Sequence, residues 1–314
     1  MSRRYDTVSF LTDWGLVDEF VGVVKSVIRD LAAHVAVTDL THQIAPFDVR
    51  AGSLALARSI SYLPQGVVLA VVDPGVGTAR NAVAIEVADG DAVLVGPDNG
   101  LLAPAVAMAG GAGRAVTLTN RDYQLEAPGA TFAGRDIFAP AVAHLCNGVD
   151  LYELGEPIDA EALLPGVIPL PRTEDDGAVL AEVLWVDHFG NCQINVGPDE
   201  LDGWGKRARV EFIVPGSGAT SDARTVVIGD ASFEAIGSGA IGLVPDSCGM
   251  LALVMNRRSA AEELRVAAGD QVVLRQLADS ENQRGALAAR PPTTPVALRR
   301  SADTRPVTPP ARPT

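Results

Sequence analysis

The sequence predicts an α/β fold, in which a mainly parallel N-terminal sheet flanked by helices is followed by a C-terminal all-β barrel domain. Two observations support this prediction. Up to about residue 164, short β-branched segments alternate with longer amphipathic ones. Beyond residue 177, the chain contains short strand-like segments separated by Gly, Asp or Pro turns.

In the N-terminal part, we expect strands at residues 7–11, 35–40, 67–73, 82–87 and 92–96. Residues 18–32 and 49–63 carry apolar side chains at helical spacing and predict two helices. Each helix follows a strand closely, as crossover connections between parallel strands require.

Proline and charged residues interrupt this pattern near residues 164–177, which is typical of a linker. We therefore predict an N-terminal domain over 1–165, a linker over 166–178, a barrel domain over 179–277, and a disordered Pro/Arg-rich tail over 278–314. The barrel strands are expected at residues 178–187, 191–196, 208–214, 224–229, 240–245, 250–256 and 271–277.

Composition limits the functional classes. The formal net charge is -14, which disfavours binding to nucleic acid or to an anionic membrane surface. The three cysteines are far apart and lack the spacing of a disulfide framework or a zinc site. The N-terminal segment turns polar before an apolar run reaches signal-peptide length, and no apolar run is long enough to cross a bilayer. We therefore expect a cytoplasmic protein.

Asp13 follows the first expected strand, where open α/β sheets bind their ligands. This carboxylate is well placed to accept hydrogen bonds from a sugar diol. The alternative is that Asp13 caps the next helix, as Asp often does. The motif alone favours the cap.

Asp73 ends another expected strand and is followed by a glycine-containing loop that reaches Arg80. No Lys-Ser or Lys-Thr follows the glycines, so this is not a phosphate-binding loop. If the loop folds back, Arg80 pairs with Asp73, lowers its pKa and keeps it ionised to orient or deprotonate a water. A surface ion pair that merely closes the loop is an equal alternative.

Four further segments carry polar groups. The turn at 96–100 and the segment at 131–136 have no chemistry that their spacing reveals. Asp187 to Asn191 concentrates polar and aromatic groups that suit an amine, a ring or a base edge, although an Asp-His pair is more often structural. In the turn at 245–249, Ser247 is a candidate carboxylate donor and Cys248 is expected to be buried. None of the four histidines has metal-ligand spacing, so we predict no metal site.

Taken in order, these segments resemble the S-adenosylmethionine hydroxide adenosyltransferases, which are hydrolytic relatives of the nucleophilic fluorinase and chlorinase. The resemblance is carried by FLTDWG, DPGVGTAR, GPDNGLL, TFAGRDIFAP, DHFGN and SCGMLALVMNRRSAAEEL, and covers nearly everything before the tail. It implies an α/β domain followed by a β-barrel. It also implies a homotrimer whose pockets lie between the first domain of one subunit and the second domain of its neighbour.

The resemblance also implies residue roles. Asp13 holds the ribose hydroxyls, and Phe47 stands where the halogenases have an aromatic residue near the sugar. Asp187 holds the methionine amine and Ser247 its carboxylate. The adenosyl group is met by Asn191 at the adenine edge, by Phe189 and Phe233, and by the backbone around Met255.

For catalysis, the hydrolases of this family use an Asp, an Arg and a His around one water. Asp73 and Arg80 match the first two, but the third position holds Ala133 in an otherwise intact motif. Either a natural variant or an engineered change accounts for this alanine. Losing such a group usually costs about 10²- to 10⁴-fold in rate, so we expect substrate binding with slow turnover.

The expected activity is hydrolysis of S-adenosyl-L-methionine to adenosine and L-methionine, by attack of water at C5′ and without a cofactor. One alternative is a halogenase that forms 5′-halo-5′-deoxyadenosine. Asp73 argues against it, because the halogenases match that position with an uncharged residue and a carboxylate repels halide. The other alternative is a non-catalytic protein that binds S-adenosylmethionine.

Overall fold

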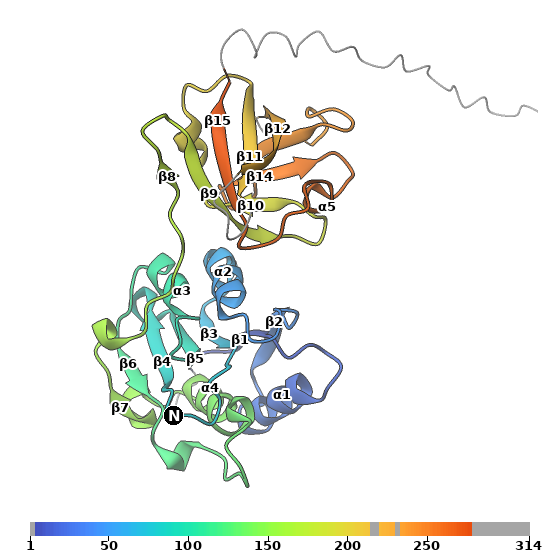
Figure 1. Cartoon of the computed structure of the whole chain (residues 1–314). Coiled ribbons are helices and arrows are strands. Elements are labelled where there is room, and N and C mark those ends of the chain that lie inside the picture. The colour runs from blue at the N-terminus through green and yellow to red at the C-terminus, as the bar shows by residue number, and fades with distance from the viewer. Residues whose placement is uncertain (1–3, 214–219, 230–232, 278–314) are drawn as a thin grey trace, which may run out of the picture.

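The computed structural model describes residues 4–213, 220–229 and 233–277. The predicted tail over 278–314 lies outside the described residues, so its disorder stays a prediction. Figure 1 shows two bodies joined by an extended segment. We call them the α/β region (residues 4–164) and the barrel (residues 179–277). The domain limits proposed from the sequence stay a prediction.

The α/β region is built on a seven-stranded sheet with the order β2-β1-β3-β5-β4-β6-β7. Strands β2, β1, β3 and β5 run parallel, and β4, β6 and β7 continue the sheet in antiparallel pairs. The strands are β1 (Thr7–Thr12), β2 (Ala36–Thr41), β3 (Gly66–Val71), β4 (Ala82–Val87), β5 (Ala92–Pro97), β6 (Ala115–Thr117) and β7 (Glu156–Pro157).

Helices cover both faces of this sheet, because alternate residues of the buried strands point to opposite sides. Along β3, Val67 and Leu69 belong to one hydrophobic core, while Val68 and Ala70 belong to the other. The first core is covered by α1 (Phe20–Leu31) and α4 (Ala139–Cys146), and the second by α2 (Val49–Ser59) and α3 (Ala103–Met108). None of the helices in the described residues has both the length and the apolar character to cross a bilayer.

The second body is a closed barrel of seven strands. Its order is β10-β14-β13-β12-β11-β15-β9, and pairing of β10 with β9 closes the ring. Closure leaves no unpaired strand edge in the ring itself. Beyond β8 (Arg172–Thr173), which is added at β9, the strands are β9 (Val179–Val186), β10 (Cys192–Ile194), β11 (Arg207–Ile213), β12 (Thr220–Ile228), β13 (Ile241–Pro245), β14 (Leu251–Met255) and β15 (Gln271–Gln276); the short helix α5 spans Ala260–Leu264.

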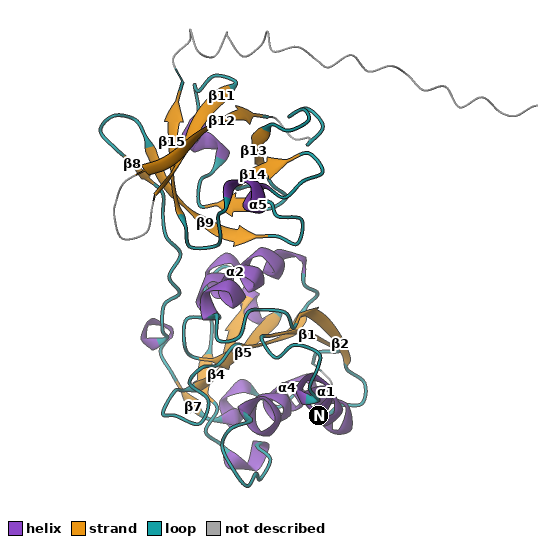
Figure 2. Ribbon diagram, turned by 45° about the vertical axis from the view of Figure 1, so that its right-hand side comes forward, coloured by secondary structure: helices purple, strands orange, loops and turns teal. Residues whose placement is uncertain are grey.

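Helix α2 is the element of the α/β region that faces the barrel (Figure 2). Asp48 caps this helix by accepting a hydrogen bond from the Ala51 N–H at 2.8 Å. Near the start of the helix, Arg50 forms an ion pair with Glu182 of β9, with an N–O distance of 2.5 Å. Near its end, the Arg58 guanidinium lies 4.8 Å from the ring centroid of Trp185, also on β9. Two arginines of one helix therefore link the two bodies.

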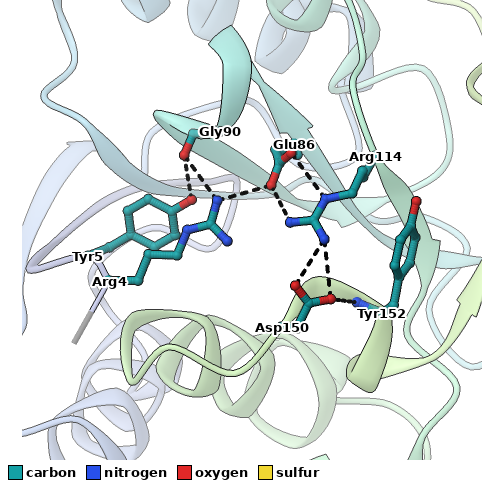
Figure 3. Close-up of polar contacts among 7 residues, drawn as sticks. All are labelled: Arg4, Tyr5, Glu86, Gly90, Arg114, Asp150 and Tyr152. Atoms are coloured by element: carbon teal, nitrogen blue, oxygen red, sulfur yellow. Dashed lines mark hydrogen bonds and ion pairs between the residues drawn. The ribbon is translucent and has the colours of Figure 1, made fainter. Parts of the chain in front are cut away.

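A separate polar network links the segment just before β1 to strand β4 of the same sheet (Figure 3). Glu86 accepts hydrogen bonds from Arg114 at 2.7 Å and 3.2 Å and from Arg4 at 3.1 Å. Arg114 also donates to Asp150 at 2.9 Å. The Arg114 side chain lowers the pKa of the Glu86 carboxyl, so this pairing stabilises the fold above the unfolded pKa of Glu86 and is lost as pH falls through the folded one.

The predicted fold class is confirmed, with small shifts in element limits. The first predicted helix, 18–32, is α1 over Phe20–Leu31. The second, 49–63, consists of α2 followed by a short 3₁₀ turn over Ile60–Tyr62. Within the predicted linker, β8 pairs with β9 and therefore extends the barrel sheet.

Candidate active site

Three loops of the α/β region converge at the carboxyl edge of its parallel strands. One follows β1 and another follows β3, and these strands are neighbours with Thr12 beside Val71. The third loop comes from the segment before α4. A Cβ at Gly77 of the second loop would lie 3.3 Å from the Ala130 carbonyl, and a Cβ at Gly134 would overlap the Trp14 ring. Glycine at 77 and 134 therefore allows the three loops to meet.

The Asp13 carboxylate faces the segment that precedes α2. Its Oδ2 accepts a hydrogen bond from the Phe47 N–H at 2.8 Å. Phe47 has a left-handed backbone with φ 69° and a side chain that is 71% exposed. Helix α1 begins at Phe20, seven residues after Asp13, and has Glu19 at its N-cap. The interpretation of Asp13 as the cap of this helix is therefore wrong.

His42 fixes the loop that carries Asp13 through contacts with the residues on either side of it, Thr12 and Gly15. The Gly15 N–H donates to the His42 carbonyl at 2.7 Å. The His42 Nδ1 and the Thr12 hydroxyl lie 2.8 Å apart, and both side chains are buried. This support fixes the direction in which β1 delivers Asp13.

Asp73 and Arg80 form the expected pair, at a distance of 2.5 Å between Oδ2 and Nη2. Their side chains are 5% and 12% exposed, so this is a buried pair and the surface alternative is wrong. Arg80 also donates to the Asn81 carbonyl at 2.9 Å, and its guanidinium lies 5.6 Å from the Phe138 ring centroid.

The effect on the Asp73 pKa is opposite to the prediction. Burial raises the pKa of the Asp73 carboxyl more than the Arg80 charge lowers it, and the nearby Asp13 charge raises it further. The sequence indicated that Arg80 is the partner of Asp73, but it did not reveal that the fold removes solvent from the Asp73 carboxylate. The result is a carboxylate that takes up a proton more readily than an exposed Asp, as a general base should.

Ala133 lies on the inner side of the third loop and is only 6% exposed. It directly precedes a π-helical turn over Gly134–Phe138, in which Arg135 and Asp136 form a pair at 2.6 Å. π-Helical turns often occur at functional sites. Ala133 itself offers no hydrogen-bonding side chain, so this position contributes only packing.

The other predicted site residues surround a cavity in the barrel, with a volume of about 920 Å³. Its lining includes all six barrel residues that the resemblance assigns to the substrate: Asp187, Phe189, Asn191, Phe233, Ser247 and Met255. They come from the β9–β10 turn, the β13–β14 turn, the end of β14 and the segment before β13. The barrel thus brings together positions that are up to 68 residues apart.

Asp187 organises its own turn. Its Oδ1 accepts hydrogen bonds from the N–H groups of Phe189 and Asn191, both at 2.8 Å, and its Oδ2 accepts from the Asn191 side-chain amide at 2.8 Å. The turn presents the exposed Phe189 ring at the rim of the cavity. Cys248 is exposed, so its expected burial is wrong: the turn at 245–249 projects from the barrel.

The two sets of site residues do not share a cavity within one chain. The lining of the barrel cavity contains none of Asp13, Phe47, Asp73, Arg80 and Ala133. Among the described residues that line it, Arg58 alone comes from the α/β region.

Arg58 and Trp185 are lining residues that the sequence reading missed. One feature of the sequence points to Arg58. Arg50 and Arg58 are eight residues apart on a predicted helix, so their side chains leave the helix from neighbouring parts of its surface. In the described part of the chain, no group of three or more His, Cys, Asp or Glu side chains is arranged to hold a metal ion.

Comparison with known proteins identifies both parts of the chain. The family model described as the SAM hydroxide adenosyltransferase N-terminal domain matches residues 8–155. The model of the C-terminal domain of the same family matches residues 181–273.

Individual relatives agree with these matches. An (R)-S-adenosyl-L-methionine hydrolase of Salinispora tropica is 43% identical over 265 residues, covering 84% of this chain and 96% of the relative. A protein of the same name from Thermus thermophilus is 40% identical over 282 residues, covering 85% and 98%. A solved structure of an uncharacterized conserved protein from Thermotoga maritima has a TM-score of 0.76 and 33% identity, covering 86% of this chain and 100% of that one. More distant relatives, 25% identical, are named fluorinases. The chain belongs to the SAM hydroxide adenosyltransferase family.

Proposed function

We propose that this protein hydrolyses S-adenosyl-L-methionine to adenosine and L-methionine, with water attacking C5′ of the ribose. The observation that carries the proposal is the buried Asp73–Arg80 pair beside the Asp13 loop, in which burial raises the Asp73 pKa. The naming of relatives at 40–43% identity as S-adenosylmethionine hydrolases supports the same reaction.

Charge explains why the reaction suits this site. Water attacks C5′, the C5′–S bond breaks, and the sulfur leaves as neutral methionine, so the positive charge of the sulfonium disappears as the nucleophile loses its proton. Asp73 orients the water and accepts that proton. Arg80 stabilises the negative charge that develops on the nucleophile. Because the side chains of this pair are at most 12% exposed, these interactions are stronger than they would be in bulk water.

The remaining residues bind the substrate in this proposal. Asp13 receives the ribose hydroxyls and Phe47 packs near the sugar. In the barrel cavity, Asp187 accepts from the methionine amine and Ser247 donates to the carboxylate. The cavity residues on the adenine side are Phe189, Asn191, Phe233 and Met255. No cofactor is required, because the substrate carries its own leaving group.

We also propose a homotrimer in which each active site combines the α/β region of one subunit with the barrel of its neighbour. The support is that Asp73 and Asp187 belong to separate surfaces within one chain. A cytoplasmic location is consistent with three cysteines that are all unpaired.

The first prediction concerns the origin of the oxygen in the product. Incubation with S-adenosyl-L-methionine in ¹⁸O-labelled water, with and without chloride, should yield labelled adenosine and unlabelled methionine by mass spectrometry. Saturable product formation separates an impaired enzyme from a pure binding protein. A 5′-halogenated nucleoside would assign the chain to the halogenases, and binding with no product at all would refute hydrolysis.

The second prediction concerns position 133. Ala133→His should raise the rate of adenosine formation by about 10²- to 10⁴-fold, because it supplies a hydrogen-bonding group for the attacking water. Ala133→Leu is the matched control, since it adds side-chain volume without a hydrogen bond and should not raise the rate. Initial rates measured by chromatography of adenosine decide the question. An unchanged rate in the histidine variant would count against the assignment of Asp73, Arg80 and position 133 to one catalytic site.

The third prediction is the pH dependence of turnover. Asp73 acts only when ionised, so kcat should fall as pH falls through its folded pKa, which lies above the ordinary value of 3.8. Asp73→Asn should lower kcat by about 10²- to 10⁴-fold and remove this acid limb. Asp89→Asn, at a left-handed turn position that Asn tolerates, is the control. An acid limb that survives in Asp73→Asn would show that another group is the base.

The fourth prediction tests the shared site. In the Ala133→His background, Asp73→Asn and Asp187→Asn should each be nearly inactive. When the two variants are unfolded, mixed in equal amounts and refolded together, about one quarter of the sites should combine two intact halves and regain activity. Separately refolded samples serve as the control. If the mixture stays inactive although native mass spectrometry, with one variant labelled with ¹⁵N, shows mixed trimers, each site lies within one chain.

A further inference from the structure

The barrel cavity is lined by a cation, Arg58, that has no ion-pair partner among the described residues. Arg58 enters the cavity lining from α2, and its Nη1 is buried with no hydrogen-bond partner among the described residues. Among the described residues, Arg58 makes a cation–π contact with Trp185, in which its guanidinium carbon lies 4.8 Å from the ring centroid. An arginine carries five donors and stays charged at neutral pH, so leaving the buried Nη1 of this half-buried residue without an acceptor is costly.

The nearby acids are already engaged. Asp246 is close enough to affect Arg58 electrostatically, but its Oδ1 accepts from the N–H groups of Cys248 and Met250, and its Oδ2 accepts from the Gln193 side chain at 2.5 Å. Asp187, the other acid of the cavity, accepts three hydrogen bonds within its own turn. Neither acid forms an ion pair with Arg58.

The other arginines of the region are different. Arg258 also lines the cavity, but it is exposed and pairs with Glu263 at 2.7 Å. Arg50, on the same helix as Arg58, also has buried nitrogens without a hydrogen-bond partner, Nε and Nη2, but its Nη1 pairs with Glu182. Burial lowers the pKa of Arg58 more than the nearby Cys248 and Asp246 raise it. Arg58 is therefore positioned to receive a negative charge from outside the chain.

We propose that Arg58 binds the carboxylate of the methionine part of the substrate. This inference rests on the proposed function, because in S-adenosylmethionine the sulfonium and the ammonium are positive and the carboxylate is the single anion. The neighbouring turn agrees with this position: Ser247 and Cys248 line the cavity together with Arg58. A guanidinium fits a carboxylate through two parallel hydrogen bonds, which a single hydroxyl does not provide.

The assignment gives α2 a role in specificity. This helix belongs to the α/β region, yet it completes the methionine end of a cavity that is otherwise built by the barrel of the same chain. A substrate without the carboxylate leaves Arg58 buried and unpaired and should bind weakly. Recognition of the amino-acid end thus depends on how the two bodies pack.

The test compares two ligands that differ in the proposed contact. Binding of S-adenosyl-L-methionine and of decarboxylated S-adenosylmethionine is measured by isothermal titration calorimetry with the unchanged chain, Arg58→Met and Arg58→Lys. Arg58→Met should weaken binding of S-adenosylmethionine by about 10- to 100-fold, as loss of a charge-assisted hydrogen bond does. Binding of the decarboxylated ligand should change by less than about threefold, because it makes no such bond. Arg58→Lys should retain part of the preference.

Arg50→Met is the matched control, because it also removes a contact between α2 and β9 but places nothing in the cavity. It should leave the ratio of the two affinities unchanged. An equal loss for both ligands in Arg58→Met would overturn the proposal and make Arg58 a packing residue between the two bodies. No loss for either ligand would overturn it as well. If the unchanged chain binds neither ligand, the proposed function itself fails, and this inference fails with it.

Discussion

The parallel pairing of β1 with β3 is the constraint that brings Asp13 and Asp73, the acids of the proposed catalytic site, to one edge of the sheet. Both strands end at the same edge of the sheet, so Asp13 and Asp73 are delivered to neighbouring loops. Two carboxylates at one edge repel each other, and the Asp13 charge contributes to the raised pKa of Asp73. Arg80 offsets this repulsion from the end of the same loop as Asp73. Because the folded pKa of Asp73 is raised, its protonated form favours folding, and that contribution is lost as pH rises through the folded pKa. In our proposal, the ionised form is the one that accepts the proton of the water.

In our proposal, the barrel cavity holds a ligand that carries charges of both signs. Its cavity turns are stabilised by their own acids, since Asp187 and Asp246 both accept from N–H groups of the turns that contain them. Because these carboxylates are used within their own turns, Arg58 has no ion-pair partner in the part of the chain that the structure describes. In our proposal the substrate carboxylate completes the set of charges, so ligand binding removes an unfavourable feature of the free protein.

The loop at Ala133 keeps its shape although position 133 carries no hydrogen-bonding side chain. The π-helical turn, the Arg135–Asp136 pair and the close approach of Gly134 to Trp14 are all present around it. These features shape the third loop of the site, and they do not require a hydrogen-bonding side chain at position 133. In our proposal, the chain therefore keeps the architecture of the site while lacking one of the groups that would contact the attacking water.

The sequence by itself determined the order of the elements, the two-part fold class and the pairing of Asp73 with Arg80, because hydrophobic periodicity and short loops are local properties. The motifs of the resemblance also located the six barrel residues that line one cavity. Tertiary structure alone decided three other points. It raised the Asp73 pKa, because desolvation comes from residues distant in the chain. It removed the helix-cap role of Asp13 by directing that carboxylate to the Phe47 N–H. It also placed Arg58 in the barrel cavity, because that contact arises only when α2 packs against β9.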